Sequence, residues 1–129
     1  MRAVEAQLQA SDEAVLAIIG RALSDGIDAL EQATNFVVAQ YGNTPAKVLA
    51  GSVPFLELFG IVAGGWQLAR SARVAHQRLQ QGSSEAGFYQ AKLHTAHFYA
   101  EHLLPRAGGL AHTVLNGGDA ALALDDALF

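Results

Sequence analysis

The chain has 129 residues, of which 51% are hydrophobic and none is cysteine, and its formal net charge is −4. This length is typical of one domain with its own core, and the lack of cysteine excludes disulfides and zinc–thiolate sites. The negative charge argues against nucleic acid as the main partner. We therefore expect residues 1–129 to form a single domain.

Residues 1–10 are polar and lack the apolar h-region of a signal peptide, so we expect a frayed, disordered lead-in. Ser11 or Asp12 can cap a first helix that runs to about Tyr41. Apolar residues recur in this helix at steps of three and four and form one stripe, made of Val15, Ile18, Ile19, Ala22, Leu30, Ala33, Val37 and Tyr41. The segment 42–45 then predicts a compact turn into the next helix.

The second helix is expected from about Pro45 to Gln81, and it is apolar on nearly every side in its first half. A helix of this kind must be covered by neighbours on more than one side, which makes it the centre of a bundle. Pro54 interrupts it, but the apolar register continues beyond the proline. We expect one continuous helix with a kink at that residue.

Three arginines, Arg70, Arg73 and Arg78, lie in the last turns of this helix, with no acidic residue between Glu57 and Glu85. One interpretation is a site for an anion such as phosphate. The other, which we favour, is that the cations complement the negative end of the helix dipole on a solvated face.

A third helix is expected from Ser84 to about Leu115, antiparallel to the second because the loop at 82–84 is short. Its apolar seam keeps its register across Pro105, which predicts one kinked helix. Asn116–Gly118 should end it, and Asp119 should cap a short final helix that folds back on the bundle through Ala121, Leu122, Leu124, Leu128 and Phe129. The predicted fold is all-α, an up-and-down antiparallel bundle of three long helices, two of them kinked at proline, with a short C-terminal helix.

The longest apolar run, Val53–Ala69, contains Glu57 and Gln67 and falls short of the roughly 20 clean residues of a membrane span. We expect no membrane span and a cytoplasmic location.

Two polar sites could carry chemistry. His94, His97 and Glu101 share one line of the third helix and form a possible metal-ligand set, although a polar, partly exposed flank explains them more simply. Glu57 is the one acid in an apolar stretch and could be a buried general base, or it could pair with an arginine or histidine. We favour the simpler interpretation in both cases.

The segment Phe59–Trp66 contains Gly60, Gly64 and Gly65, and it also has two interpretations. The glycines could allow close helix packing inside the bundle. The segment could instead be an exposed apolar surface for a partner, with Trp66 as an anchor. The two can coexist, and the second predicts a homodimer or a larger homo-oligomer.

Two stretches resemble the C-terminal accessory domain of bacterial acyl-CoA dehydrogenases. The first is PFLELFGIVAGGW at 54–66 with LARSA at 68–72, and the second is FYQAK at 88–92 with AHFYAEHLLP at 96–105. The similarity spans roughly residues 15–118. It implies a helical domain that follows a catalytic core, where a glutamate takes the α-proton of an acyl-CoA and FAD takes a hydride, to give a 2,3-enoyl-CoA.

No residue of this chain matches that glutamate or a flavin-binding motif, so the resemblance implies no catalytic and no cofactor-binding residue here. Our leading hypothesis is an excised, non-catalytic C-terminal domain that supports the catalytic core and subunit assembly. The first alternative is a stand-alone helical metal or cofactor carrier using His94, His97 and Glu101. The second is a peripheral lipid-surface protein, although the chain lacks the basic face that such helices carry.

Overall fold

The longest helix, α4, is the element against which the others pack. The structure is a computed structural model that describes residues 1–123 of the chain. Its helices, in chain order, are α1 (Arg2–Gln9), α2 (Ala14–Gln40), α3 (Pro45–Ala50), α4 (Ser52–Gln80), α5 (Ala86–His102) and α6 (Arg106–Ala121). All five other helices contact α4.

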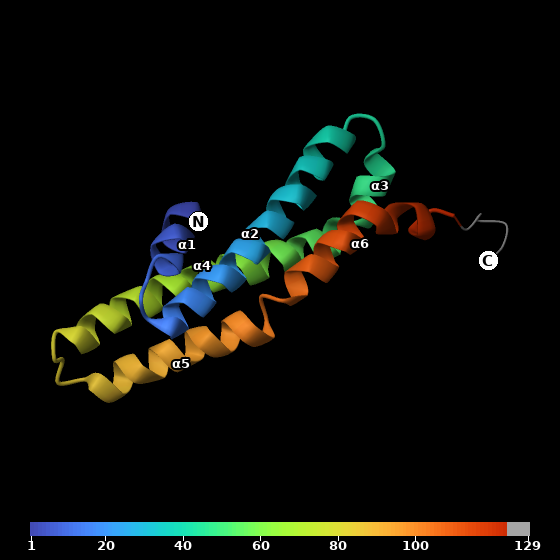
Figure 1. The fold of residues 1–129 in the computed structure, drawn as a ribbon. Coiled ribbons are helices and arrows are strands. Elements are labelled where there is room, and N and C mark those ends of the chain that lie inside the picture. The colour runs from blue at the N-terminus through green and yellow to red at the C-terminus, as the bar shows by residue number, and fades with distance from the viewer. Residues whose placement is uncertain (124–129) are drawn as a thin grey trace.

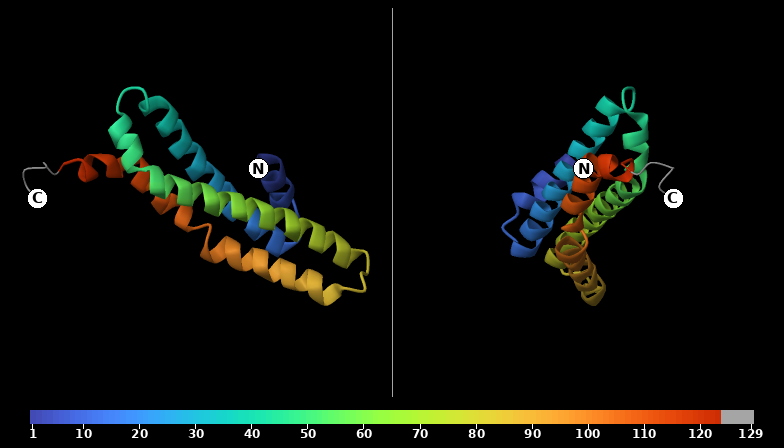
Figure 2. Two further views of the ribbon diagram at one scale, coloured as in Figure 1. Left: turned by 180° about the vertical axis from the view of Figure 1, so that it is seen from behind. Right: turned by 90° about the vertical axis from the view of Figure 1, so that its right-hand side faces the viewer.

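The helices form an elongated bundle in which α2, α4 and the pair α5–α6 alternate in direction (Figure 1). Figure 2 shows α5 and α6 lying along α4, while α2 crosses it on another side. The described residues contain no strand. The predicted all-α helical bundle is therefore confirmed.

The core consists of one apolar face from each long helix. On α2 and in the first half of α4 it is built mainly from branched side chains, whereas the second half of α4, together with α5 and α6, contributes mostly small ones, which let the backbones approach closely. The buried residues of these four helices include Leu16, Ile19, Leu23, Leu58, Val62, Ala69, Ala96, Ala100, Ala107 and Val114.

The predicted kink at Pro54 is wrong, because the helix breaks earlier, at Gly51. Gly51 has φ −88° and ψ 1° and separates α3 from α4. A Cβ at Gly51 would lie 3.5 Å from the Cα of Val114, so α6 passes close to this break. Pro54 lies in the first turn of α4, where a backbone N–H has no partner within the helix to lose.

The predicted single helix through Pro105 is also wrong. Helix α5 ends at His102, and the amides of Leu103 and Leu104 both donate to the carbonyl of Tyr99, at 3.0 and 3.1 Å. Pro105 precedes the first residue of α6. The side chain of Leu104 is 3% exposed and lies between Gly65 of α4 and Gly26 of α2, so the break inserts an apolar side chain into the core.

The sequence predicted that the helix ends at Asn116–Gly118, but α6 continues to Ala121. Asp119 is a residue within α6 that pairs with Lys47, and it does not cap a further helix. A Cβ at Gly118 would lie 3.0 Å from the carbonyl oxygen of Lys47, which explains why glycine suits this close contact with α3. Leu124, Leu128 and Phe129 of the expected final helix lie outside the described residues.

Residues 2–9 form helix α1, which corrects the expectation of a disordered lead-in. Leu8 is 1% exposed in the core, and a Cβ at Gly20 of α2 would lie 2.8 Å from the backbone nitrogen of Gln9. The guanidinium of Arg2 donates to Asp28 and Glu31 at 2.5 and 2.7 Å, and these hydrogen bonds raise the pKa of Arg2 above its ordinary value.

Among the described helices, α4 alone is long and apolar enough to cross a membrane by length and composition. Core helices of soluble proteins pass the same test, so this is weak evidence for a span.

Candidate functional site

Two of the central glycines pack inside the bundle. A Cβ at Gly65 would lie 2.8 Å from Cδ2 of Leu104, and a Cβ at Gly64 would lie 2.7 Å from the hydroxyl oxygen of Tyr99. That hydroxyl donates to the carbonyl oxygen of Ile61 at 3.1 Å and so joins α5 to α4. Burial raises the pKa of Tyr99, an effect that nearby Arg106 partly opposes.

Phe59 and Gly60 lie outside this packed region. A Cβ at Gly60 would meet no heavy atom within 4 Å, and Phe59 is 50% exposed. Trp66 is partly buried against the core, and its ring lies 5.2 Å from the guanidinium carbon of Arg70. The structure thus places the segment Phe59–Trp66 partly in the interior and partly on the surface.

Phe59 ends a run of exposed apolar side chains that we name the α3–α4 stripe. Its members are Leu49, Val53, Leu56 and Phe59, which follow one another at steps of four, three and three residues and are 60%, 74%, 74% and 50% exposed. Exposed apolar side chains that cluster in this way are typical of a surface that another molecule covers.

Glu57 lies beside this stripe and is not the buried base that one interpretation required. Its carboxylate pairs with the guanidinium of Arg106, and the two side chains are 42% and 53% exposed. The alternative of pairing with an arginine is confirmed. An exposed carboxylate that is already paired with a cation is a surface contact between α4 and α6.

The candidate metal ligands are only partly brought together. Nε2 of His97 lies 3.7 Å from the carboxylate of Glu101, whose side chain is 55% exposed, and His94 is exposed. Over residues 1–123, no group of three or more histidine, aspartate or glutamate side chains is placed to hold a metal ion. The arrangement therefore gives the metal-binding alternative no support.

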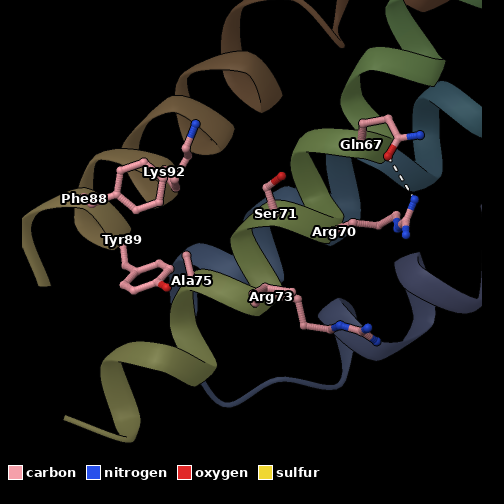
Figure 3. A pocket seen from close by; sticks show the side chains of 9 residues that line it. Gln67, Arg70, Ser71, Arg73, Ala75, Phe88, Tyr89 and Lys92 are labelled. Carbon is pink, nitrogen blue, oxygen red and sulfur yellow. Dashed lines mark hydrogen bonds between the residues drawn. The ribbon is translucent and has the colours of Figure 1, made fainter. Parts of the chain in front are cut away.

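A groove of about 440 Å³ lies between α4 and α5 near the loop that joins them. Arg70 and Arg73 of α4 line it together with Phe88, Tyr89 and Lys92 of α5. In Figure 3 the two arginines extend from α4 on one side, Arg73 toward α1, and Phe88 and Lys92 lie on α5 on the other side. We name this feature the α4–α5 groove.

The side chains of the α4–α5 groove make few contacts with one another. Nη1 of Arg70 donates to Oε1 of Gln67 at 3.0 Å, and Arg73 donates to Gln7 of α1. The ammonium of Lys92 lies 5.1 Å from the centre of the Phe88 ring, which packs edge-on against Tyr89 with the ring centres 5.3 Å apart. The cations of this groove are thus paired with neutral groups.

The sequence had pointed to Arg70 and Arg73 but not to Lys92 or the aromatic pair. Those residues belong to the next helix, and the periodicity of one helix does not show which residues of another helix will lie beside it. The signal that could have found them is the short loop at 82–84, which folds the start of α5 back along the end of α4.

Comparison with known proteins gives consistent matches. A family model described as "Acetyl-CoA dehydrogenase C-terminal like" matches residues 1–125. The chain is 36% identical over 104 residues to the 3-methylmercaptopropionyl-CoA dehydrogenase of Ruegeria pomeroyi, covering 81% of this chain and 18% of that protein. It is 31% identical over 117 residues to the broad-specificity linear acyl-CoA dehydrogenase FadE5 of Mycobacterium tuberculosis, covering 88% of this chain and 19% of that protein. The chain spans less than a fifth of the length of these curated relatives.

Proposed function

Because the chain belongs to the acetyl-CoA dehydrogenase C-terminal-like family, we propose that it is the C-terminal accessory domain of a longer acyl-CoA dehydrogenase. The observation that carries this proposal is the match over residues 1–125, together with two relatives that are both acyl-CoA dehydrogenases. In this proposal the parent enzyme oxidises an acyl-CoA to a 2,3-enoyl-CoA in the cytoplasm, and the present domain supports it without performing the chemistry.

The α3–α4 stripe is the surface through which we propose that the domain acts. More than four-fifths of each relative lies outside the matched region, so a large partner is attached to this domain in those proteins. Four apolar side chains that are each at least half exposed gain free energy when such a partner covers them, at roughly 25 cal/mol per Å² of apolar surface. The proposed partner is the catalytic core, and in the isolated chain a second copy can take its place.

FAD is assigned to the catalytic core of the parent and not to this chain. A site for a cofactor of this size buries most of the ligand in a concave pocket. The hollows among the described residues are open grooves on the surface, such as the α4–α5 groove. These residues therefore do not fit an isoalloxazine ring by themselves, and we derive no step through the flavin.

The test of this proposal is a flavin spectrum and a turnover assay on the purified chain. We expect no flavin absorption band after purification with added FAD, and no oxidation of acyl-CoA thioesters in the presence of an artificial electron acceptor. Addition of the separately expressed catalytic core should restore a complex that elutes as one species. A flavin band that bleaches when acyl-CoA is added to the chain alone would contradict the proposal.

A further inference from the structure

The outer face of α4 carries a regular row of side chains, which we name the α4 seam: Val53, Leu56, Gly60 and Ala63. They follow one another at steps of three, four and three residues, the spacing at which one helix packs on another in a coiled coil. The first three are exposed and Ala63 is partly buried. The one charged residue of segment 52–66 is Glu57, which is paired with an arginine of α6 and lies outside the seam. The α4 seam is therefore an uncharged surface with the pattern of a helix contact, and it shares Val53 and Leu56 with the α3–α4 stripe.

Gly60 makes a depression in the α4 seam that contacts within the described chain do not explain. Glycine in a helix interior is unfavourable relative to alanine, so its presence calls for a close neighbour. Gly65 has such a neighbour, because a Cβ there would lie 2.8 Å from Cδ2 of Leu104. A Cβ at Gly60 would meet no heavy atom of the described residues within 4 Å. Leu56, one turn away, is 74% exposed. A depression next to a projecting leucine is a shape that a second copy of the same surface can fill.

The α4 seam is complementary to itself when two copies of α4 lie antiparallel. A two-fold axis brings the same patch of both copies together. With the axis beside residue 58, Leu56 of each copy faces Gly60 of the other and Val53 faces Ala63, because both pairs are centred on that position. Each large side chain then meets a small residue, which is how the knobs of one helix enter the holes of another.

Other arrangements of the two helices fill the seam less well. In a parallel pair Gly60 would face Gly60 and leave the depression empty, while Leu56 would meet Leu56. In the next antiparallel register Leu56 would face Gln67, a polar side chain. The register centred on residue 58 also brings Phe59 of both copies, each 50% exposed, to one flank of the contact. The antiparallel pair centred on residue 58 therefore covers the most apolar surface.

We propose that two copies of this chain associate by antiparallel packing of α4 on α4, with Leu56 of each copy seated over Gly60 of the other. Copies with a net charge of −4 repel one another, and the α4 seam offers them a surface where no charge has to lose its water. Glu57, beside the seam, keeps Arg106 as its partner in both copies. This inference rests on the part of the proposed function that assigns the α3–α4 stripe to a partner, and it specifies the register of that contact when the partner is a second copy.

Exchange of the large and the small residue tests this register. Gly60→Leu places two leucines opposite each other and should weaken dimerisation about tenfold or more in sedimentation equilibrium. Inside one copy there is room for the new side chain, because a Cβ at residue 60 meets no heavy atom of the described residues within 4 Å. Leu56→Ala alone removes the knob and should also weaken dimerisation. The double variant Leu56→Ala, Gly60→Leu again sets a small residue opposite a large one, so its dimerisation should return to within about threefold of the wild type.

Disulfide formation tests the direction of the two helices, because the chain itself has no cysteine. Leu56→Cys chains and Gly60→Cys chains, mixed under mild oxidation, should form a disulfide between the two kinds of chain, since a disulfide needs Cα atoms within about 7 Å of each other. Either variant alone should form few disulfides, because equal positions of this antiparallel pair are displaced by a further ~6 Å along the helix. Val38→Cys on α2 is the matched control, since Val38 is 75% exposed, and it should form no disulfide with either variant.

Melting curves will show that every variant is folded. The proposal is overturned if the wild-type chain is monomeric at high concentration, or if the double variant associates as weakly as Gly60→Leu. It is also overturned if Leu56→Cys and Gly60→Cys each form disulfides with themselves as readily as with one another, which would indicate parallel helices. None of these results involves flavin or turnover, so each of them refutes the α4 pairing and leaves the proposed function to its own test.

Discussion

Replacing Gly65 by alanine and replacing Gly60 by alanine should change stability in opposite directions, although both residues lie within α4. A Cβ at Gly65 would lie 2.8 Å from Cδ2 of Leu104 and 3.1 Å from both Cδ1 and Cγ. Rotation of the leucine cannot relieve all three contacts, because Cγ is not the flexible end of the side chain. Leu104 is also held from the other side, where a Cβ at Gly26 would lie 3.2 Å from Cδ2.

The expected size follows from two opposing terms. Overpacking of a tight core costs about 1–3 kcal/mol, whereas alanine stabilises a helix interior by about 1 kcal/mol relative to glycine. Gly65→Ala should therefore destabilise the fold by about 1 kcal/mol. At Gly60 a Cβ meets nothing within 4 Å, so only the favourable helix term remains, about 1 kcal/mol.

Urea and thermal unfolding of the two variants beside the wild-type chain would measure the difference. We expect a gap of about 2 kcal/mol in the free energy of unfolding, which corresponds to roughly 8 °C in melting temperature for a domain of this size. If Gly65→Ala were as stable as Gly60→Ala, Leu104 would not be clamped between the two glycines and the close packing of α4 would be refuted.

Three further predictions concern the contacts that hold α4 and α1 in place. Tyr99→Phe removes the hydrogen bond to the carbonyl of Ile61 and should cost about 1 kcal/mol in urea unfolding; an unchanged midpoint would show that this bond does not matter. Burial raises the pKa of Tyr99 in the folded state, so the folded state binds the proton more tightly. The contribution of this proton binding to the free energy of unfolding should be complete below the unfolded pKa of about 10 and be lost as the pH rises through the folded pKa. A Tyr99→Phe chain whose free energy of unfolding falls as steeply as that of the wild type above about pH 10 would contradict this. Leu8→Ala should cost about 2–4 kcal/mol because Leu8 is 1% exposed, and a cost near zero would mean that α1 is not part of the core.

The helical class and the central position of α4 could be predicted because they depend on composition and on a periodicity that extends over many residues. The helix breaks could not. Proline is the residue that most disfavours a helix interior, so Pro54 and Pro105 were expected to mark kinks, yet the breaks fall at Gly51 and at residues 103–105. Both breaks lie at tertiary contacts that the sequence does not show, where α6 passes close to Gly51 and where Leu104 inserts between two glycines.

Helix α1 was missed for a related reason. Its eight residues are too few to form a stable helix alone, and one buried leucine with the ion pairs of Arg2 attaches it to α2. The resemblance to the acyl-CoA dehydrogenase C-terminal domain depended on specific stretches within 54–105, and the family match over residues 1–125 confirms it.

The surface of α4 was predictable only in part. The glycine spacing could not distinguish interior from exterior, and the structure places Gly64 and Gly65 inside and Gly60 outside. The α3–α4 stripe also depends on where α3 turns into α4, which the sequence did not show. The prediction of a dimer or larger assembly stays a prediction.

Sedimentation equilibrium of the purified chain tests most directly whether the exposed face of α4 is a contact surface. The comparison is between the wild type, Leu56→Asp in the α3–α4 stripe and Val38→Asp on α2, since Leu56 and Val38 are 74% and 75% exposed and neither substitution disturbs the core. We predict that the wild type and Val38→Asp associate into dimers or larger species and that Leu56→Asp is monomeric. A monomeric wild-type chain at high concentration, or equal association of all three, would contradict the account.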